Sequence, residues 1–239
     1  MSWFQLDPES IARRALTDST DMKMASLASS LWRGIIGFTI VSVAGFAPWA
    51  LFGRWFHRTL GEGGMYAACA IVFIGLSGLL LHRLIIGPDS LARFYKLFSI
   101  AFAAYSIGWI AGWMALSGHT GSLVGLLAGT TLMGWIFVRA FDARGKFVKV
   151  VASLFILNCL GYFVGGWVEG GVATIKDMSI LGLTLTKKTQ MKTAMLLWGV
   201  CYGIGFGAGL GLAFHFCQAR ARSLIAGRLE NTNRNPLPS

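Results

Sequence analysis

Six apolar runs that contain no charged residue constrain this chain more than any other feature of its sequence. Each run is 19 to 22 residues long, and an α-helix needs about 20 residues to cross a hydrocarbon core of about 30 Å. Only 13% of the 239 residues are charged, whereas a soluble domain has about a quarter. The sequence therefore predicts an all-α, polytopic membrane protein whose six transmembrane helices cover Gly34–Gly53, Gly63–Leu81, Leu97–Gly118, Thr120–Val138, Val150–Val168 and Thr193–Phe214.

The basic residues predict how these helices are oriented. If the connector 139–149 is cytoplasmic, fifteen of the 21 Lys and Arg lie on the cytoplasmic side. By the positive-inside rule, both termini are then cytoplasmic. We expect the protein to lie in an inner membrane of bacterial type. We predict a cytoplasmic amphipathic segment 1–30, a six-helix domain 31–218 and a basic, partly disordered cytoplasmic tail 219–239, with disorder beginning after Gly227. The six Lys and Arg that are predicted to lie on the outer side of the membrane are Arg54, Arg58, Lys176, Lys187, Lys188 and Lys192.

The N-terminal segment carries the signals of a short amphipathic helix. Asp7 is a good N-cap and Pro8 suits the first helical position. The apolar residues share one face, which either lies in the membrane interface or packs on a cytoplasmic loop. That face consists of Ile11, Ala12, Ala15 and Leu16.

The connectors differ in length. We expect the second helix to continue to Ile86 and to stop at Gly87, and we expect a very short turn at 117–119 between the third and fourth helices. The long outer connector Glu169–Lys192 alternates apolar and small or polar residues at 181–186, a period typical of a strand or hairpin. It is interpreted either as a lid or as an irregular loop.

Glycines recur at four-residue intervals in several of the predicted helices. Among the 31 glycines, this spacing places small residues along one helical stripe, where two backbones can approach closely. The last helix has extra glycines at 205 and 209, so it could contact helices on both sides or move between them. We predict packing faces at Gly121, Gly125, Gly129, Gly161, Gly165, Gly199, Gly203, Gly207 and Gly211.

One amide, Asn158, lies within a predicted span. An unpaired amide in hydrocarbon costs several kcal/mol, so Asn158 must face the bundle, as does Tyr162 one turn further on. Either Asn158 makes an interhelical hydrogen bond, for instance to Thr130 or Thr131, or these four residues bind a solute. No Asp, Glu, Lys, Arg or His lies near the centre of a predicted span, which disfavours proton pumps and carriers of charged solutes.

Catalytic and cofactor chemistry find little support in the sequence. His82 and His215 both fall near cytoplasmic helix ends and are weak candidates for a metal or haem, because sequence cannot show that two ligands converge. We expect no cofactor and no metal. The net charge of +11 does not predict nucleic-acid binding, because the positive charges sit at helix ends and form no basic stripe.

The sequence favours a non-enzymatic membrane protein that acts as a subunit, scaffold or assembly component. Its expected partners are the lipid bilayer and either further copies of itself or other membrane subunits. The alternative is a small channel or permease for a neutral or weakly polar solute, with the long connector as its lid. An enzyme that uses the cytoplasmic histidines is the least favoured class.

Overall fold

The computed structural model describes residues 3–18, 25–176, 178–180 and 183–234. Within this part of the chain, six helices are long and apolar enough to cross a membrane, as the apolar runs predict. Each extends beyond its run at one end or both. The six are α2 (Leu27–Thr59), α3 (Gly61–Leu81), α4 (Ser90–Leu116), α5 (Gly118–Ala140), α6 (Phe147–Thr174) and α7 (Lys187–Cys217).

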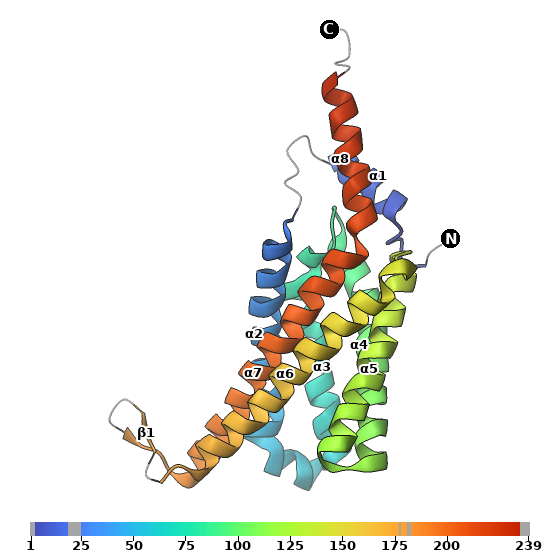
Figure 1. Ribbon diagram of the computed structural model, residues 1–239. Helices are drawn as coiled ribbons and strands as arrows, with labels where there is room; N and C mark the ends of the chain where they lie inside the picture. Colours follow the sequence, from blue (N-terminus) through green and yellow to red (C-terminus); the bar gives the residue numbers. More distant parts are fainter. Residues whose placement is uncertain (1–2, 19–24, 177, 181–182, 235–239) are drawn as a thin grey trace.

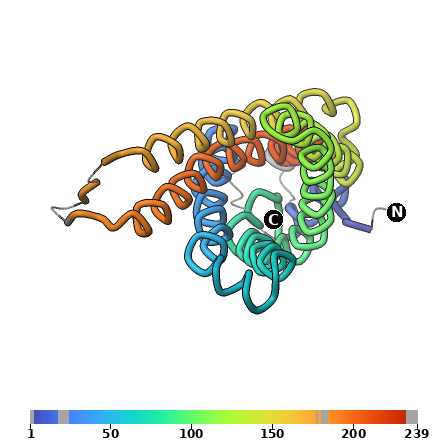
Figure 2. Tube along the Cα trace, turned by 90° about the horizontal axis from the view of Figure 1, so that it is seen from below, coloured from blue at the N-terminus to red at the C-terminus, as the bar shows by residue number. Residues whose placement is uncertain are grey.

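The six helices form a ring in which each packs mainly against two neighbours. Consecutive helices are neighbours from α2 to α6, and α7 closes the ring by packing between α6 and α2. Both termini lie at one end of the bundle, which we call the termini end, and the opposite end is the hairpin end (Figure 1). Figures 1 and 2 show that α6 and α7 lean away from the other helices as an antiparallel pair toward the hairpin end.

Two shorter helices pack against each other at the termini end. Helix α1 (Pro8–Asp18) begins as predicted, with the Ser10 amide donating to the Asp7 carboxylate at 2.9 Å. Its apolar face is buried against α8 (Ala219–Arg234), where Ala12 and Ala15 contact Ile225. Of the two interpretations of this face, the structure therefore favours packing on protein, and both α8 and the connector residue Ile86 contact it.

Two segment boundaries differ from the sequence prediction. Helix α2 begins at Leu27, capped by the Ser26 hydroxyl, so the boundary predicted at residue 30 falls inside a helix. The C-terminal segment stays helical to Arg234, beyond the point at Gly227 where we expected order to end. Its buried contact with α1 explains the difference, because packing on another helix overrides weak local propensity. Residues 235–239 lie outside the described part.

The connectors confirm some predictions and correct others. Helix α3 ends at Leu81 and a 3-10 turn covers His82–Leu84, so the predicted extension to Ile86 is wrong. The turn between α4 and α5 is as short as predicted, with positive φ at Ser117 and Gly118. The predicted hairpin is present as β1 (Ser179–Ile180) paired antiparallel with β2 (Leu183–Thr184), although helices occupy much of the predicted connector.

Aromatic side chains fill the interior. Along α4 the rings of Phe94, Phe98 and Phe102 stack at centroid distances of 5.1 and 5.3 Å, because residues four apart share a helix face. Phe214 of α7 stacks on Phe94 at 5.6 Å. Further toward the middle of the bundle, Tyr105 stacks on Phe206 at 5.0 Å. These rings lead from the termini end to the one buried amide of α6.

Candidate functional site

Three polar side chains from three helices meet inside the bundle. Asn158 of α6 donates from Nδ2 to the Tyr105 hydroxyl of α4 at 2.9 Å. That hydroxyl lies 3.0 Å from the hydroxyl of Tyr202 on α7. Asn158 has no exposed surface, and Tyr105 and Tyr202 are 4% and 5% exposed. The group links three helices that are distant in sequence, as buried polar networks often do.

The residues predicted to act with Asn158 are not brought together with it by hydrogen bonds. The Thr130 hydroxyl donates to Leu126 O in its own helix at 2.7 Å, and this intrahelical bond satisfies it. Thr131 is only partly buried. Tyr162 pairs its hydroxyl with that of Ser122 on α5 at 3.1 Å. Asn158 does form an interhelical hydrogen bond, but the partner predicted on α5 is wrong, and the observed partner is on α4.

Aromatic rings enclose this polar group. Trp198 stacks on Tyr202 at 5.3 Å and meets Tyr162 edge-on at 5.5 Å. Phe46 of α2 packs edge-on against Trp198 at 4.8 Å. One atom of the group stays unsatisfied, because Asn158 Oδ1 has no hydrogen-bond partner among the described residues. A buried carbonyl without a partner costs about 1–3 kcal/mol.

Glycines lie where helix backbones approach most closely. A Cβ built on Gly203 of α7 would lie 2.6 Å from Thr39 Cα of α2, and one built on Gly161 of α6 would lie 2.7 Å from Cys201 O of α7. Real Cβ atoms essentially never come this close. Helix α7 therefore lies between α2 and α6 with glycines toward each: Gly203, Gly207 and Gly211 toward α2, and Gly205 and Gly209 toward α6.

The remaining predicted glycines have similar surroundings, with one exception. Helices α4 and α5 meet where a Cβ on Gly108 would lie 2.9 Å from Gly129 Cα, and Gly121 and Gly125 face the backbone of α4 nearby. Gly165 faces Trp198 of α7. Gly199 is looser, because the nearest atom to its Cβ position would be a Phe46 ring carbon at 3.3 Å.

A second set of glycines faces open space. No atom lies within 4 Å of a Cβ built on Gly166, Gly170 or Gly171 of α6, and the same is true of Gly75 in α3. Trp167, between the first two, is 80% exposed. Helix α6 therefore has one glycine pair against α7 and another, four residues apart, on a surface without a neighbour.

The two candidate histidines have different partners. His82 Nδ1 lies 2.8 Å from the Ser90 hydroxyl, whereas His215 Nδ1 lies 3.5 Å from the Ser30 hydroxyl. In the described ranges there is no group of three or more His, Cys, Asp or Glu that could hold a metal ion. Each imidazole thus has a serine hydroxyl as its neighbour.

A buried glutamine that the sequence analysis did not single out joins the bundle to the connector between α3 and α4. Gln218, 2% exposed, donates from Nε2 to Leu84 O at 2.7 Å and accepts from the Ile86 amide at 2.8 Å. Its amide thus pairs with backbone groups of the connector much as another strand would. The only sequence signal was a polar residue four positions after the end of the last apolar run.

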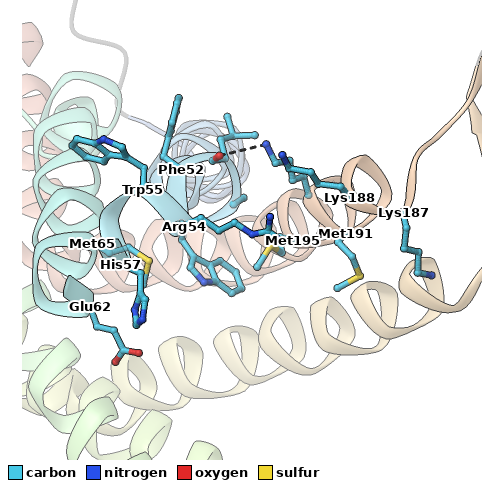
Figure 3. A pocket seen from close by; sticks show the side chains of 15 residues that line it. Phe52, Arg54, Trp55, His57, Glu62, Met65, Lys187, Lys188, Met191 and Met195 are labelled. Atoms are coloured by element: carbon cyan, nitrogen blue, oxygen red, sulfur yellow. Dashed lines mark hydrogen bonds between the residues drawn. The ribbon is translucent and has the colours of Figure 1, made fainter. Parts of the chain in front are cut away.

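A basic cavity of about 750 Å³ opens at the hairpin end, between the end of α2 and the starts of α3 and α7 (Figure 3). Its polar lining has four Lys and Arg side chains, the imidazole of His57 and one carboxylate, that of Glu62. Lys192 Nζ donates to Leu51 O at 3.3 Å and so joins α7 to α2 beside the cavity. The basic residues are Arg54, Lys187, Lys188 and Lys192.

No protein-family model, no curated protein and no solved structure matches this chain. The described residues form a ring of six long apolar helices with two short helices at the termini end. This is the architecture of a multi-pass membrane protein.

Proposed function

We propose that this protein is a non-enzymatic integral membrane subunit that serves as a scaffold or assembly component. It lies in an inner membrane of bacterial type with both termini in the cytoplasm, so that the hairpin end faces outward. The charge bias of fifteen to six Lys and Arg supports this orientation. Its partners are the bilayer and further copies of the chain.

The observation that carries this proposal is the enclosed polar group of Asn158, Tyr105 and Tyr202. A carrier needs its midplane polar groups free to exchange solvent for substrate. Here they hydrogen-bond to one another and are nearly fully buried. Close backbone contacts at the glycines of α7 add to a rigid bundle, because dispersion and interhelical hydrogen bonds drive helix association in lipid.

Assembly is assigned to the open glycines of α6. A glycine that faces lipid gains no packing, whereas a pair four residues apart allows a second helix to approach closely. Gly166 and Gly170 have this spacing and no neighbour within 4 Å of their Cβ positions, and the exposed Trp167 offers a large contact area beside them. The same face of a second copy can pack on it in a symmetric contact.

The experiment is the mass of the purified chain in nanodiscs or mild detergent. We expect a dimer for the wild type and a monomer for Gly166→Leu and Gly170→Leu, because these side chains enter open space within the protomer and act only on the contact between copies. Gly75→Leu is the matched control, since its Cβ position is equally open. A wild-type monomer, or a G166L/G170L dimer, would contradict the assignment.

A solute channel is the second candidate, and one observation favours it: Asn158 Oδ1 has no partner. A solute or water passing the midplane could supply its donor. Flux of small neutral solutes into proteoliposomes tests this function. Flux that disappears in Asn158→Leu would support the channel, whereas an impermeable wild type, or flux unchanged by the substitution, would rule it out.

A further inference from the structure

We propose that the cavity at the hairpin end binds the phosphate of an anionic lipid headgroup. The inference goes beyond the scaffold function; it rests on the proposed membrane insertion but not on the self-association of α6. It follows from the charge of the cavity, from its position beside the ends of the apolar runs, and from its mixed lining.

The cavity gathers positive charge that forms no ion pair with the carboxylates of the described residues. Of the six Lys and Arg assigned to the outer side, four line it. Arg54 and Lys188 form no ion pair within the part of the chain that the structure describes. Lys187 and Lys192 donate to the backbone oxygens of Ala173 and Leu51, and each ammonium keeps two further N–H groups. Positive charge on the outer side opposes the orientation rule, so its concentration here indicates a local anionic ligand.

The chemistry of these side chains matches a phosphate. An arginine guanidinium presents paired donors to phosphate oxygens, and lysine adds point charges that can reorient. Figure 3 shows Arg54 extending from α2 toward the α7 segment that carries Met191 and Met195, with Lys188 on the same segment. Glu62 lies at the edge of the view, on the α3 side. The basic groups of two helices thus face one space.

The depth and lining of the cavity select a lipid over a free anion. Arg54 directly follows the first apolar run and Lys192 directly precedes the last, so both belong at headgroup level. Behind them the lining is apolar, with Trp49, Met65 and Met195. A lipid whose headgroup phosphate gives it a net negative charge satisfies both halves of such a cavity, whereas inorganic phosphate satisfies only the basic half.

The test compares lipid binding to the purified full chain by native mass spectrometry. Phosphatidylglycerol and phosphatidylcholine with the same acyl chains are titrated separately onto wild type and onto Arg54→Gln/Lys188→Gln. We expect the wild type to prefer phosphatidylglycerol, and the double variant to lose about tenfold in affinity for it, since each basic residue near a membrane surface contributes on the order of a fewfold or more. Phosphatidylcholine binding should not change.

A matched control removes two charges that are also exposed, at the opposite end, in Lys146→Gln/Lys149→Gln. Its phosphatidylglycerol affinity should stay within about twofold of wild type, because these residues are far from the cavity. An equal loss in both double variants would overturn the proposal, since only net charge would then matter. Displacement of the lipid by an equal concentration of inorganic phosphate would overturn the assignment to a lipid. A wild-type chain that binds neither phosphatidylglycerol nor phosphatidylcholine would contradict the membrane insertion on which the proposal rests.

Discussion

The Asn158 amide of α6 donates to the Tyr105 hydroxyl of α4 at 2.9 Å, across 53 residues of sequence. Replacing either partner should destabilise the bundle, and the two effects should not add. We expect a coupling free energy of about 0.5–2 kcal/mol between Asn158→Leu and Tyr105→Phe, as for other interhelical hydrogen bonds in membrane proteins. Reversible unfolding in mixed micelles measures it. Tyr66→Phe, at an exposed position of α3, serves as control. Strictly additive effects of Asn158→Leu and Tyr105→Phe would mean that their hydrogen bond does not stabilise the bundle.

The hydrogen bonds of Gln218 should stabilise the termini end of the bundle. Gln218→Leu keeps the volume but leaves Leu84 O and the Ile86 amide without their partner, which should cost about 1–3 kcal/mol in the free energy of unfolding. Hydrogen exchange of the peptide that covers residues 82–92 should become faster in this variant. Asn231→Leu, at an exposed position of α8, should leave that exchange unchanged; protection retained in Gln218→Leu would refute the role.

Close contact between α2 and α7 predicts an asymmetric response to a single methyl group. Gly203→Ala places a Cβ 2.6 Å from Thr39 Cα, so the helices must separate at a cost of about 1–3 kcal/mol. Gly75→Ala places the same methyl in open space and should be neutral or slightly stabilising. Thermal unfolding of the two variants side by side measures the contrast. Equal melting temperatures would mean that the glycines of α7 are not needed for packing.

The proposed orientation makes a separate prediction. In intact cells, a cysteine at Lys188 should react with a membrane-impermeant maleimide, whereas one at Arg228 should react only after the membrane is opened. Both positions are exposed, so accessibility reports the side of the membrane and not burial. The opposite pattern would invert the topology and place the basic cavity in the cytoplasm.

The sequence predicted the six long helices because uncharged runs of about 20 residues have few other uses. It also predicted the hairpin from the alternation at 181–186, the start of α1 from its capping residues, and the short turn at Ser117 from the spacing of the apolar runs. Helix ends were less predictable. Helix α7 starts at Lys187, six residues before its apolar run, because the polar residues between them can continue a helix. Helix α8 packs on α1 through Ile225, a contact that no local pattern encodes.

Tertiary partners lay beyond what one sequence can supply. Asn158 was identified as the buried amide, but its partner depends on which helix adjoins α6 at that depth, and Tyr105 lies two helices away along the chain. The basic cavity combines Arg54 and Lys188, which are more than a hundred residues apart. In the sequence these residues appeared only as exceptions to the positive-inside bias.

Cross-linking between copies tests the central claim most directly. In a background in which Cys69, Cys159, Cys201 and Cys217 are replaced by serine or alanine, a cysteine at Gly170 should form a disulfide-linked dimer in native membranes under mild oxidation. A cysteine at Gly75, equally open within the protomer, should not. A Gly170→Cys protein that stays monomeric, or that cross-links no more than Gly75→Cys, would contradict assembly through this face of α6.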